Sequence, residues 1–288
     1  MYEVARETPL QYAPVLSSKT GSSVWLKRED TQRTFGFNVR GAHNAIASGD
    51  TENGVVACSA GNHAEGVAMS ARLLNIEATI VVPSNTSKAR LEAIQRHCPK
   101  RIVRRGANFN DVLNVAQRIA EEENLCFIHP FDDENVIVGQ ATVGAEIVRQ
   151  IGSKELDAIF CVTGGGGLLS VSLLYFIHKK IHTCKITHTQ QGLSTYVKQV
   201  RPDVKIFGVE SMDASPLYAS LKLGMRTKLT EDLPGLLDDA GPTFIGKRNF
   251  ALCREHVDDV IRVSTDEVCA AVKDAFDETR VLLDPAGK

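Results

Sequence analysis

Short apolar runs alternate with longer amphipathic stretches along most of the chain from residue 54 onward. Apolar runs rich in β-branched residues predict strands, and apolar positions at helical spacing predict helices. The sequence predicts strands at 55–59, 78–83, 101–105 and 125–129, and helices at 63–75, 88–97 and 109–123. Because strands and helices alternate one by one, we expect a parallel sheet covered by helices, which is the α/β class.

The alternation resumes after Gly139 and indicates a second α/β lobe. A helix is expected there, through Ile147 and Ile151. Further strands are expected at 158–163, 205–210 and 257–263. Ser264 and Glu267 then have the spacing of a capping box, which predicts the start of a C-terminal helix.

Segment 170–191 breaks this alternation, because it holds no acidic residue and separates a glycine run from the helix that the run should open. We interpret it as an insert, and we hypothesise that it is translated intron sequence. The alternative is a metal site, since two of its histidines have i, i+4 spacing. Its candidate ligands would be His178, His182, Cys184 and His188. We favour the insert and expect no metal site.

The composition narrows the classes of partner. Of the 288 residues, 43% are hydrophobic and 24% are charged, as is typical of soluble globular proteins. A formal net charge of −2 predicts no nucleic-acid partner, and no apolar run reaches the roughly 20 residues that span a bilayer. We therefore expect a small-molecule partner and no membrane partner.

The seven cysteines are scattered and include no C-x-x-C pair. An odd number without motif spacing indicates reduced thiols rather than a disulfide framework. We therefore expect an intracellular protein. The sequence does not distinguish cytoplasm, mitochondrion and plastid.

Four consecutive glycines, Gly164–Gly167, follow the strand expected at 158–163. Without side chains, backbone N–H groups can close around an anion at a strand-to-helix turn. The run therefore predicts a phosphate cradle. A plain turn is the alternative, and the glycines alone do not decide between the two.

Residues 59–66 also lie between an expected strand and an expected helix. The first amides of that helix can hold a carboxylate, and the side chain of Asn62 can donate a hydrogen bond to a phenolic oxygen. The alternative is an ordinary helix start in which Asn62 satisfies local backbone groups. Two anion sites in one chain suit an amino acid and a phosphorylated cofactor.

These two turns belong to a larger set of segments that together resemble threonine ammonia-lyase, also called threonine dehydratase or deaminase. The segments are 25–30 (WLKRED), 35–42 (FGFNVRGA), 59–66 (SAGNHAEG), 131–133 (FDD), 139–140 (GQ), 164–168 (GGGGL) and 196–203 (YVKQVRPD). This combination is specific, and the resemblance covers most of the chain outside 170–191. Serine racemase and cysteine synthase are related alternatives, and blocks 131–133 and 196–203 favour threonine ammonia-lyase.

The resemblance implies a pyridoxal-phosphate enzyme of fold type II with the two-lobed tryptophan-synthase-β-like fold, each lobe a mostly parallel sheet flanked by helices. Residues 1–37 and 146–288 would form the large lobe and residues 38–145 the small lobe, with pyridoxal 5'-phosphate between them. The family reaction converts L-threonine to 2-oxobutanoate and ammonia in isoleucine biosynthesis. Family members usually associate, so a homo-oligomer is expected.

The resemblance also assigns roles to individual residues. The phosphate of the cofactor would be held by Gly164, Gly165, Gly166, Gly167 and Leu168. Asn62 would contact the 3'-oxygen of the pyridoxal ring, and Phe37 would pack beside that ring. The substrate carboxylate would be held by Ser59, Ala60, Gly61, Asn62 and His63.

The residue after Phe37 is the main departure from the family pattern. In the family this position is a lysine that bonds to the cofactor and takes the α-proton of the substrate, whereas here it is Asn38. An amide can do neither, and loss of a general base costs roughly 10² to 10⁴-fold in rate. We therefore expect an impaired enzyme in which any cofactor is bound without a covalent bond.

A second departure is the end of the chain at 285–288 (PAGK), before the family residue that meets the pyridine nitrogen. The resemblance therefore implies an incomplete large lobe with exposed apolar surface. Two alternatives to an impaired lyase stay open. One is a non-catalytic homologue that binds a phosphorylated cofactor or an amino acid, and the other is an unproductive gene model.

Overall fold

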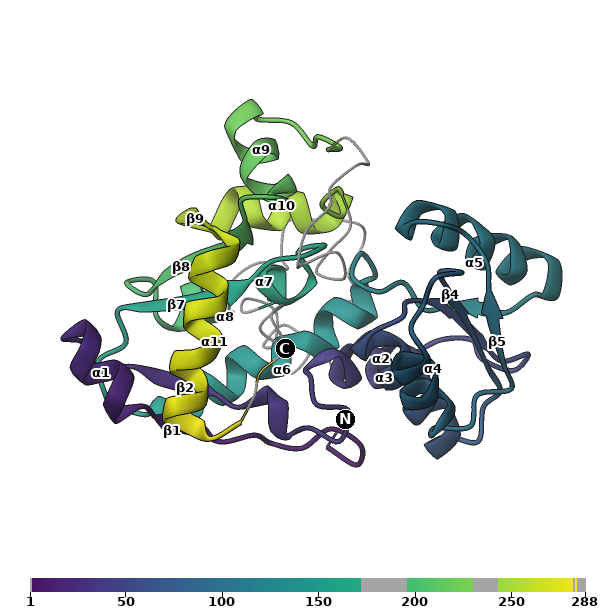
Figure 1. Cartoon of the computed structure of the whole chain (residues 1–288), viewed down its shortest axis with the longest axis horizontal. Coiled ribbons are helices and arrows are strands. Elements are labelled where there is room, and N and C mark those ends of the chain that lie inside the picture. Colours follow the sequence, from purple (N-terminus) through teal and green to yellow (C-terminus); the bar gives the residue numbers. More distant parts are fainter. Residues whose placement is uncertain (1, 172–195, 230–242, 282, 284–288) are drawn as a thin grey trace, which may run out of the picture. The chain divides into compact units, whose positions relative to one another are not determined.

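The computed structural model describes residues 2–171, 196–229, 243–281 and 283, and the chain divides into two compact units. The first unit comprises Met1–Arg6 and Gln32–Gln140, and the second comprises Glu7–Thr31 and Ala141–Lys288 (Figure 1). The lobe boundaries expected from the sequence stay a prediction. Most of the segment interpreted as an insert, including its three histidines, lies outside the described residues.

The sheet of the first unit has the strand order β5-β4-β3-β6, and all of its pairs are parallel. Its strands are β3 (Val55–Cys58), β4 (Ala78–Val82), β5 (Arg101–Arg104) and β6 (Cys126–Phe127). The helices that connect them are α3 (Asn62–Leu73), α4 (Lys88–Gln95) and α5 (Phe109–Glu123). The predicted α/β class and the predicted strand and helix alternation are confirmed here.

Helices cover both faces of this sheet. Val55 and Ile80 pack in a cluster with α2 (Asn38–Ser48) and α3, whereas Val56 and Val81 pack in a second cluster with α5. Figure 1 shows α5 on one side of the sheet and α3 and α4 on the other. Because the central strands β3 and β4 face apolar helices on both sides, their sequences are almost entirely apolar.

Glycines allow α2 to approach two neighbouring helices closely. A Cβ atom on Gly66 of α3 would lie 3.0 Å from the Cα of Val39, and one on Gly139 of α6 (Glu134–Ile151) would lie 2.5 Å from the carbonyl oxygen of Arg40. The helix expected through Ile147 and Ile151 is confirmed, but it begins at Glu134 and not after Gly139, because this glycine packs inside the helix. The side chain of Asp133 accepts the N–H of Val136 at 2.9 Å at that start.

The second unit contains two sheets. β1 (Leu10–Tyr12) pairs antiparallel with β2 (Trp25–Lys27), and a parallel sheet has the order β7-β8-β9. The parallel strands are β7 (Ala158–Val162), β8 (Lys205–Ser211) and β9 (Asp259–Val263). The helices, including one 3-10 helix, are α1 (Pro14–Thr20), η1 (Glu29–Thr31), α7 (Gly167–Val171), α8 (Tyr196–Val200), α9 (Pro216–Leu223), α10 (Lys247–His256) and α11 (Thr265–Thr279).

The predicted capping box at the start of α11 is confirmed. The hydroxyl of Ser264 accepts the N–H of Glu267 at 3.3 Å, and the carboxylate of Glu267 accepts the N–H of Ser264 at 2.7 Å. Two amides at the helix start that lack a backbone partner are thereby satisfied by the side chains of Ser264 and Glu267, which are three residues apart. The sequence therefore determines this boundary locally.

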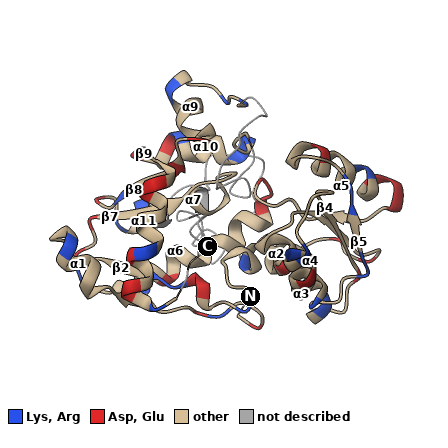
Figure 2. Ribbon diagram, viewed as in Figure 1, with Lys and Arg blue, Asp and Glu red and all other residues tan. Residues whose placement is uncertain are grey.

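Charged residues of both signs are spread along the described ribbon (Figure 2). The acidic residues Glu121–Glu123 form the exposed C-terminal end of α5. Within the described ranges, none of the helices is long and apolar enough to cross a bilayer.

Candidate functional site

The glycine run forms the turn between β7 and α7 in the second unit. Gly166 has a φ of +89°, a conformation that favours glycine. A Cβ atom on Gly166 would lie 2.8 Å from the side chain of Ile245 and 2.9 Å from that of Asn249, so no larger residue fits. The turn therefore presents bare backbone, as a phosphate cradle requires.

The turn is also fastened to the segment that opens α10. The carbonyl oxygen of Gly165 accepts the N–H of Gly246 at 3.2 Å and the side-chain amide of Asn249 at 2.9 Å. Sequence reasoning missed this contact, because the two partners of Gly165 lie about eighty residues further along the chain. A glycine and an asparagine at a helix start were the only local signal.

In the first unit, residues 59–63 form the turn between β3 and α3. The hydroxyl of Ser59 accepts the N–H of Gly61 at 3.0 Å, and Gly61 is the N-cap of α3 without a side-chain cap. The first amides of an α-helix have no acceptor within the helix, and the aligned peptide dipoles of this twelve-residue helix give its N-terminal end a partial positive charge. Ser59, Ala60, Gly61 and Asn62 are partly exposed. The N–H groups of Ser59 and Gly61 already have acceptors, so a carboxylate here would meet the remaining amides of the turn.

His63 differs from its neighbours because it is buried. Its Nε2 lies 3.2 Å from the carbonyl oxygen of Ile128, which can only accept, so Nε2 carries the proton. Burial lowers the pKa of His63 to about 4, and the imidazole is neutral at physiological pH. His63 therefore anchors the turn to the strand end after β6.

The side chain of Asn62 rests against Gly36. A Cβ atom on Gly36 would lie 2.2 Å from the Nδ2 of Asn62, so the amide occupies the volume that any larger residue would need. Asn62 donates to the carbonyl oxygen of Phe35 at 3.5 Å, which is long for a hydrogen bond. The structure thereby brings the segment that carries Phe37 and Asn38 beside the 59–63 turn.

Asn38 is the first residue of α2, and Phe37 is its N-cap. Both side chains are half-buried. Because Gly66 and Gly139 hold α2 against its neighbours, the position of Asn38 is set by helix packing and not by its own side chain. A lysine at residue 38 would therefore have its Cα atom at the same place, at the start of α2.

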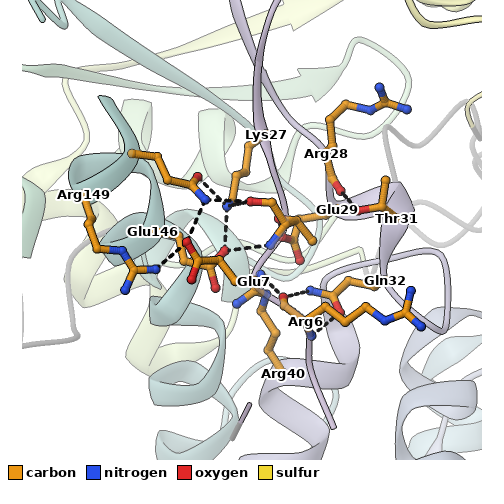
Figure 3. Close-up of polar contacts among 12 residues, drawn as sticks. Arg6, Glu7, Lys27, Arg28, Glu29, Thr31, Gln32, Arg40, Glu146 and Arg149 are labelled. Carbon is orange, nitrogen blue, oxygen red and sulfur yellow. Dashed lines mark hydrogen bonds and ion pairs between the residues drawn. The ribbon is translucent and has the colours of Figure 1, made fainter. Parts of the chain in front are cut away.

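Lys27 is the nearest lysine in sequence, and its ammonium group is occupied. Nζ contacts Glu146 at 2.6 Å, the carbonyl oxygen of Thr8 at 2.7 Å and Gln150 at 3.0 Å. The side chain of Glu146 is fully buried and that of Lys27 is 9% exposed. Figure 3 shows Lys27 directed at Glu146 within this network. Glu146 lies in an otherwise apolar stretch of α6, and a buried charge of this kind signals a partner.

One further carboxyl group in the second unit has an unusual environment. Burial raises the pKa of Glu210 to about 7, although its oxygens accept the N–H groups of Leu217 at 2.9 Å and Tyr218 at 2.8 Å.

Among the described residues, no group of three or more histidine, cysteine or acidic side chains could hold a metal ion. The three histidines weighed as metal ligands lie outside those residues.

Comparison with known protein families finds one family that covers nearly the whole chain. The family described as "Pyridoxal-phosphate dependent enzyme" matches residues 2–288. The chain belongs to this family. The tryptophan-synthase-β-like α/β fold expected from the sequence is confirmed by solved members of it.

Several similar members of the pyridoxal-phosphate family are threonine dehydratases. The mitochondrial threonine dehydratase of Schizosaccharomyces pombe is 45% identical over 291 residues, which cover all of this chain and 44% of that protein. The biosynthetic L-threonine dehydratase IlvA of Burkholderia multivorans is 39% identical, and 53% of it is covered. The chain thus spans about half the length of the curated relatives it matches.

Solved structures of this family include threonine deaminase and serine racemase. The processed form of threonine deaminase isoform 2 from Solanum lycopersicum matches with a TM-score of 0.87 and 36% identity, covering 99% of this chain and 72% of that one. Maize serine racemase matches with a TM-score of 0.85 and 28% identity, covering 99% and 79%. The resemblance found in the sequence motifs is therefore confirmed at the level of the family.

Proposed function

We propose that the chain is a threonine ammonia-lyase-like protein that binds pyridoxal 5'-phosphate without a covalent bond and is impaired in converting L-threonine to 2-oxobutanoate and ammonia. The observation that carries the proposal is the glycine turn 164–167, which has no side chains and is held by a hydrogen bond from Asn249 to the carbonyl oxygen of Gly165. The family match and the threonine dehydratase relatives support the same ligand.

Three parts of the chain would contact the cofactor. The amides of the 164–167 turn and Leu168 would hold its phosphate, and Phe37 would pack beside its ring. Asn62 would donate to the 3'-oxygen, because its 3.5 Å contact with Phe35 leaves the amide weakly engaged. Once bound, pyridoxal phosphate supplies an electron sink for charge that develops on the substrate α-carbon.

The substrate would be held through its carboxylate at the start of α3. Asn62, the first residue of this helix, is partly exposed, and the partial positive charge of the helix end favours an anion. His63 would act only as an anchor, because it is neutral and its Nε2 proton is committed to Ile128.

The impairment follows from Asn38. Its amide nitrogen is not basic, so it can neither bond to the cofactor nor take the α-proton of the substrate. Lys27 does not replace it, because three acceptors, one of them the buried carboxylate of Glu146, hold its ammonium group. Losing a general base alone should lower the rate by roughly 10² to 10⁴-fold.

Asn38 also favours a second candidate, a non-catalytic homologue that binds a phosphorylated cofactor or an amino acid. An unproductive gene model with a retained intron is a further alternative to both. Homo-oligomer formation and an intracellular location are expected with the lyase-like function, in line with relatives named mitochondrial or chloroplastic.

The test is a titration of the purified protein with pyridoxal 5'-phosphate, followed by gel filtration, borohydride reduction and an assay of 2-oxobutanoate release from L-threonine. We expect bound cofactor, no borohydride-stable adduct and little product. Asn38→Lys should restore both adduct and product, whereas Ser48→Lys, at the exposed end of the same helix, should restore neither. An adduct with wild-type protein would contradict the proposal.

A further inference from the structure

The carbonyl oxygen of Gly165 is held from one side by two donors. The backbone N–H of Gly246 and the side-chain amide of Asn249 both point at it, at 3.2 and 2.9 Å. Asn249 is fully buried in the first turn of α10, and Gly165 is buried as well. A buried amide that donates at 2.9 Å is costly to remove, because its acceptor then loses a partner that water does not replace.

The direction of this carbonyl sets the direction of the next amide. A trans peptide unit is planar, so its C=O and N–H point in opposite directions. The described chain has no cis peptide bond. With the oxygen of Gly165 turned toward α10, the N–H of Gly166 must therefore point away from α10.

Contacts on Gly166 keep this peptide unit from rotating. Its φ of +89° is available to glycine, and the positions around its Cα are filled by Ile245 and Asn249 at 2.8 and 2.9 Å from the place of a Cβ atom. The turn and the start of α10 therefore move as one body. An amide that is aimed in advance loses little freedom when an anion binds.

We propose that Asn249 is a positioning residue for the phosphate cradle: it holds the carbonyl of Gly165 so that the N–H of Gly166 is aimed at a phosphate monoester. The inference rests on the proposed function, since it takes the glycine turn as the phosphate site. Asn249 itself does not touch the ligand.

The experiment measures binding by equilibrium dialysis of two probes, pyridoxal 5'-phosphate and phosphate-free pyridoxal, to the full chain. Asn249→Asp keeps the shape of the side chain but replaces its donor with an acceptor, and Asn249→Ala removes it. Both variants should bind pyridoxal 5'-phosphate about tenfold or more weakly than wild type, from the loss of one buried hydrogen bond. Their affinity for pyridoxal should stay as in wild type, because the change acts on the phosphate alone.

Asn44→Ala is the matched control. Asn44 also donates to a backbone carbonyl, that of Asn135 at 2.8 Å, but in the first unit. This variant should bind both probes as wild type does.

Gly246→Pro provides a second route if the Asn249 variants do not fold. The φ of Gly246 is −57°, which suits proline, and proline lacks the N–H that Gly165 accepts. It should cause a smaller loss of affinity for pyridoxal 5'-phosphate and none for pyridoxal.

The outcomes separate the two proposals. If wild type binds neither probe, the proposed function is wrong and the positioning role with it. If wild type binds pyridoxal 5'-phosphate and the variants bind it equally well, only the positioning role is overturned. A loss of the same size for both probes would also overturn it, because Asn249 would then act on the fold and not on the phosphate site.

Discussion

The parallel sheets of the two units differ in how much of each strand is buried. Every residue of β3 and β4 in the first unit is buried. In the second unit, β7 and β9 each contain buried and exposed residues, and Phe160 and Ile261 on their outer face are 61% and 39% exposed. The rings of Phe160 and Phe207 stack on this face with centroids 5.1 Å apart.

This difference shows that the pairing of strands and their burial are separate properties. Both sheets are parallel, yet among the described strands only β3 and β4 of the first have every residue buried, and burial of apolar residues is what stabilises a core. Parallel sheets normally have helices on both faces. In the second unit, α11 has no fully buried residue, so its apolar residues stay partly in contact with solvent. The outer sheet face is also partly exposed, at Phe160 and Ile261.

The second unit instead relies on a buried polar network for part of its cohesion. Lys27 joins β2, the segment at Thr8 and α6 through one ammonium group. Such a network fixes one arrangement of its elements, but it is sensitive to the loss of any member. The comparison therefore predicts that the two units respond differently to the same kind of substitution.

The largest effect is expected from Lys27→Met. It leaves the carboxylate of Glu146 buried without its cation, which should lower the free energy of unfolding by about 3 to 5 kcal/mol. Urea denaturation measures this change, and hydrogen exchange should show the loss of protection in the second unit.

Two further variants test the cause of that loss. The double variant Lys27→Met with Glu146→Leu removes both charges and should recover most of the stability. Lys100→Met breaks the exposed ion pair with Glu77 in the first unit and should leave the urea midpoint unchanged. A double variant as unstable as the single one would show that the buried charge is not the cause.

The next effect concerns the apolar layer of the first unit. Ile80 is fully buried in β4, so Ile80→Ala should cost about 2 to 5 kcal/mol, the usual range for a core cavity. Phe160→Ala, on the exposed face of β7, should change the free energy of unfolding by about 0.5 kcal/mol or less. Equal costs for the two, measured by urea denaturation, would contradict the contrast between the sheets.

Acid should act on the two units in opposite directions. His63 has an ordinary pKa of 6.5 that burial lowers to about 4, so the unfolded chain binds more protons between these values. Its contribution to stability is therefore lost as pH falls from 6.5 to 4. Glu210 has an ordinary pKa of 4.5 that burial raises to about 7, so the folded chain binds more protons, and stability is lost as pH rises from 4.5 to 7.

The variants His63→Gln and Glu210→Gln remove each titration while keeping a polar group of similar size. Relative to wild type, His63→Gln should gain stability as pH falls from 6.5 to 4.5, and Glu210→Gln should gain it as pH rises over the same range. Each change should approach about 3 kcal/mol at most. Trends of the same sign in urea denaturation at these pH values would refute the assignment of the two groups.

The smallest effect on stability is expected from Phe160→Lys. The side chain is mostly exposed, so the free energy of unfolding should change by about 0.5 kcal/mol or less. A charge beside Phe207 and Ile261 interrupts the apolar face, and the concentration at which the protein precipitates should rise. Unchanged solubility would mean that this face does not drive association.

Most strands and helices could be predicted from the sequence, because each depends on residues a few positions apart. The helix at Phe109–Glu123 and the capping box at Ser264 are examples. The boundary at Gly139 was predicted wrongly, because glycine marks both helix ends and close helix packing, and only the approach of Arg40 to within 2.5 Å of a Cβ position separates the two.

The candidate site divides in the same way. The glycine turn and the 59–63 turn could be recognised in the sequence, since each is a short run of residues with its own backbone chemistry. The family could be recognised from these and the other motifs together. The sequence did not show which residues contact those turns. Asn249 and Gly36 act through contacts with Gly165 and Asn62 that the chain makes only after folding.

By itself, the sequence determined the order of the elements, the place of the bare glycine backbone and the absence of a lysine at residue 38. The tertiary structure decided that Lys27 is engaged with Glu146, that Asn249 donates to Gly165, and that β4 is fully buried while β7 is not. The physical reason is range. Backbone propensity acts over a few residues, whereas burial and ion pairing depend on which distant segments meet.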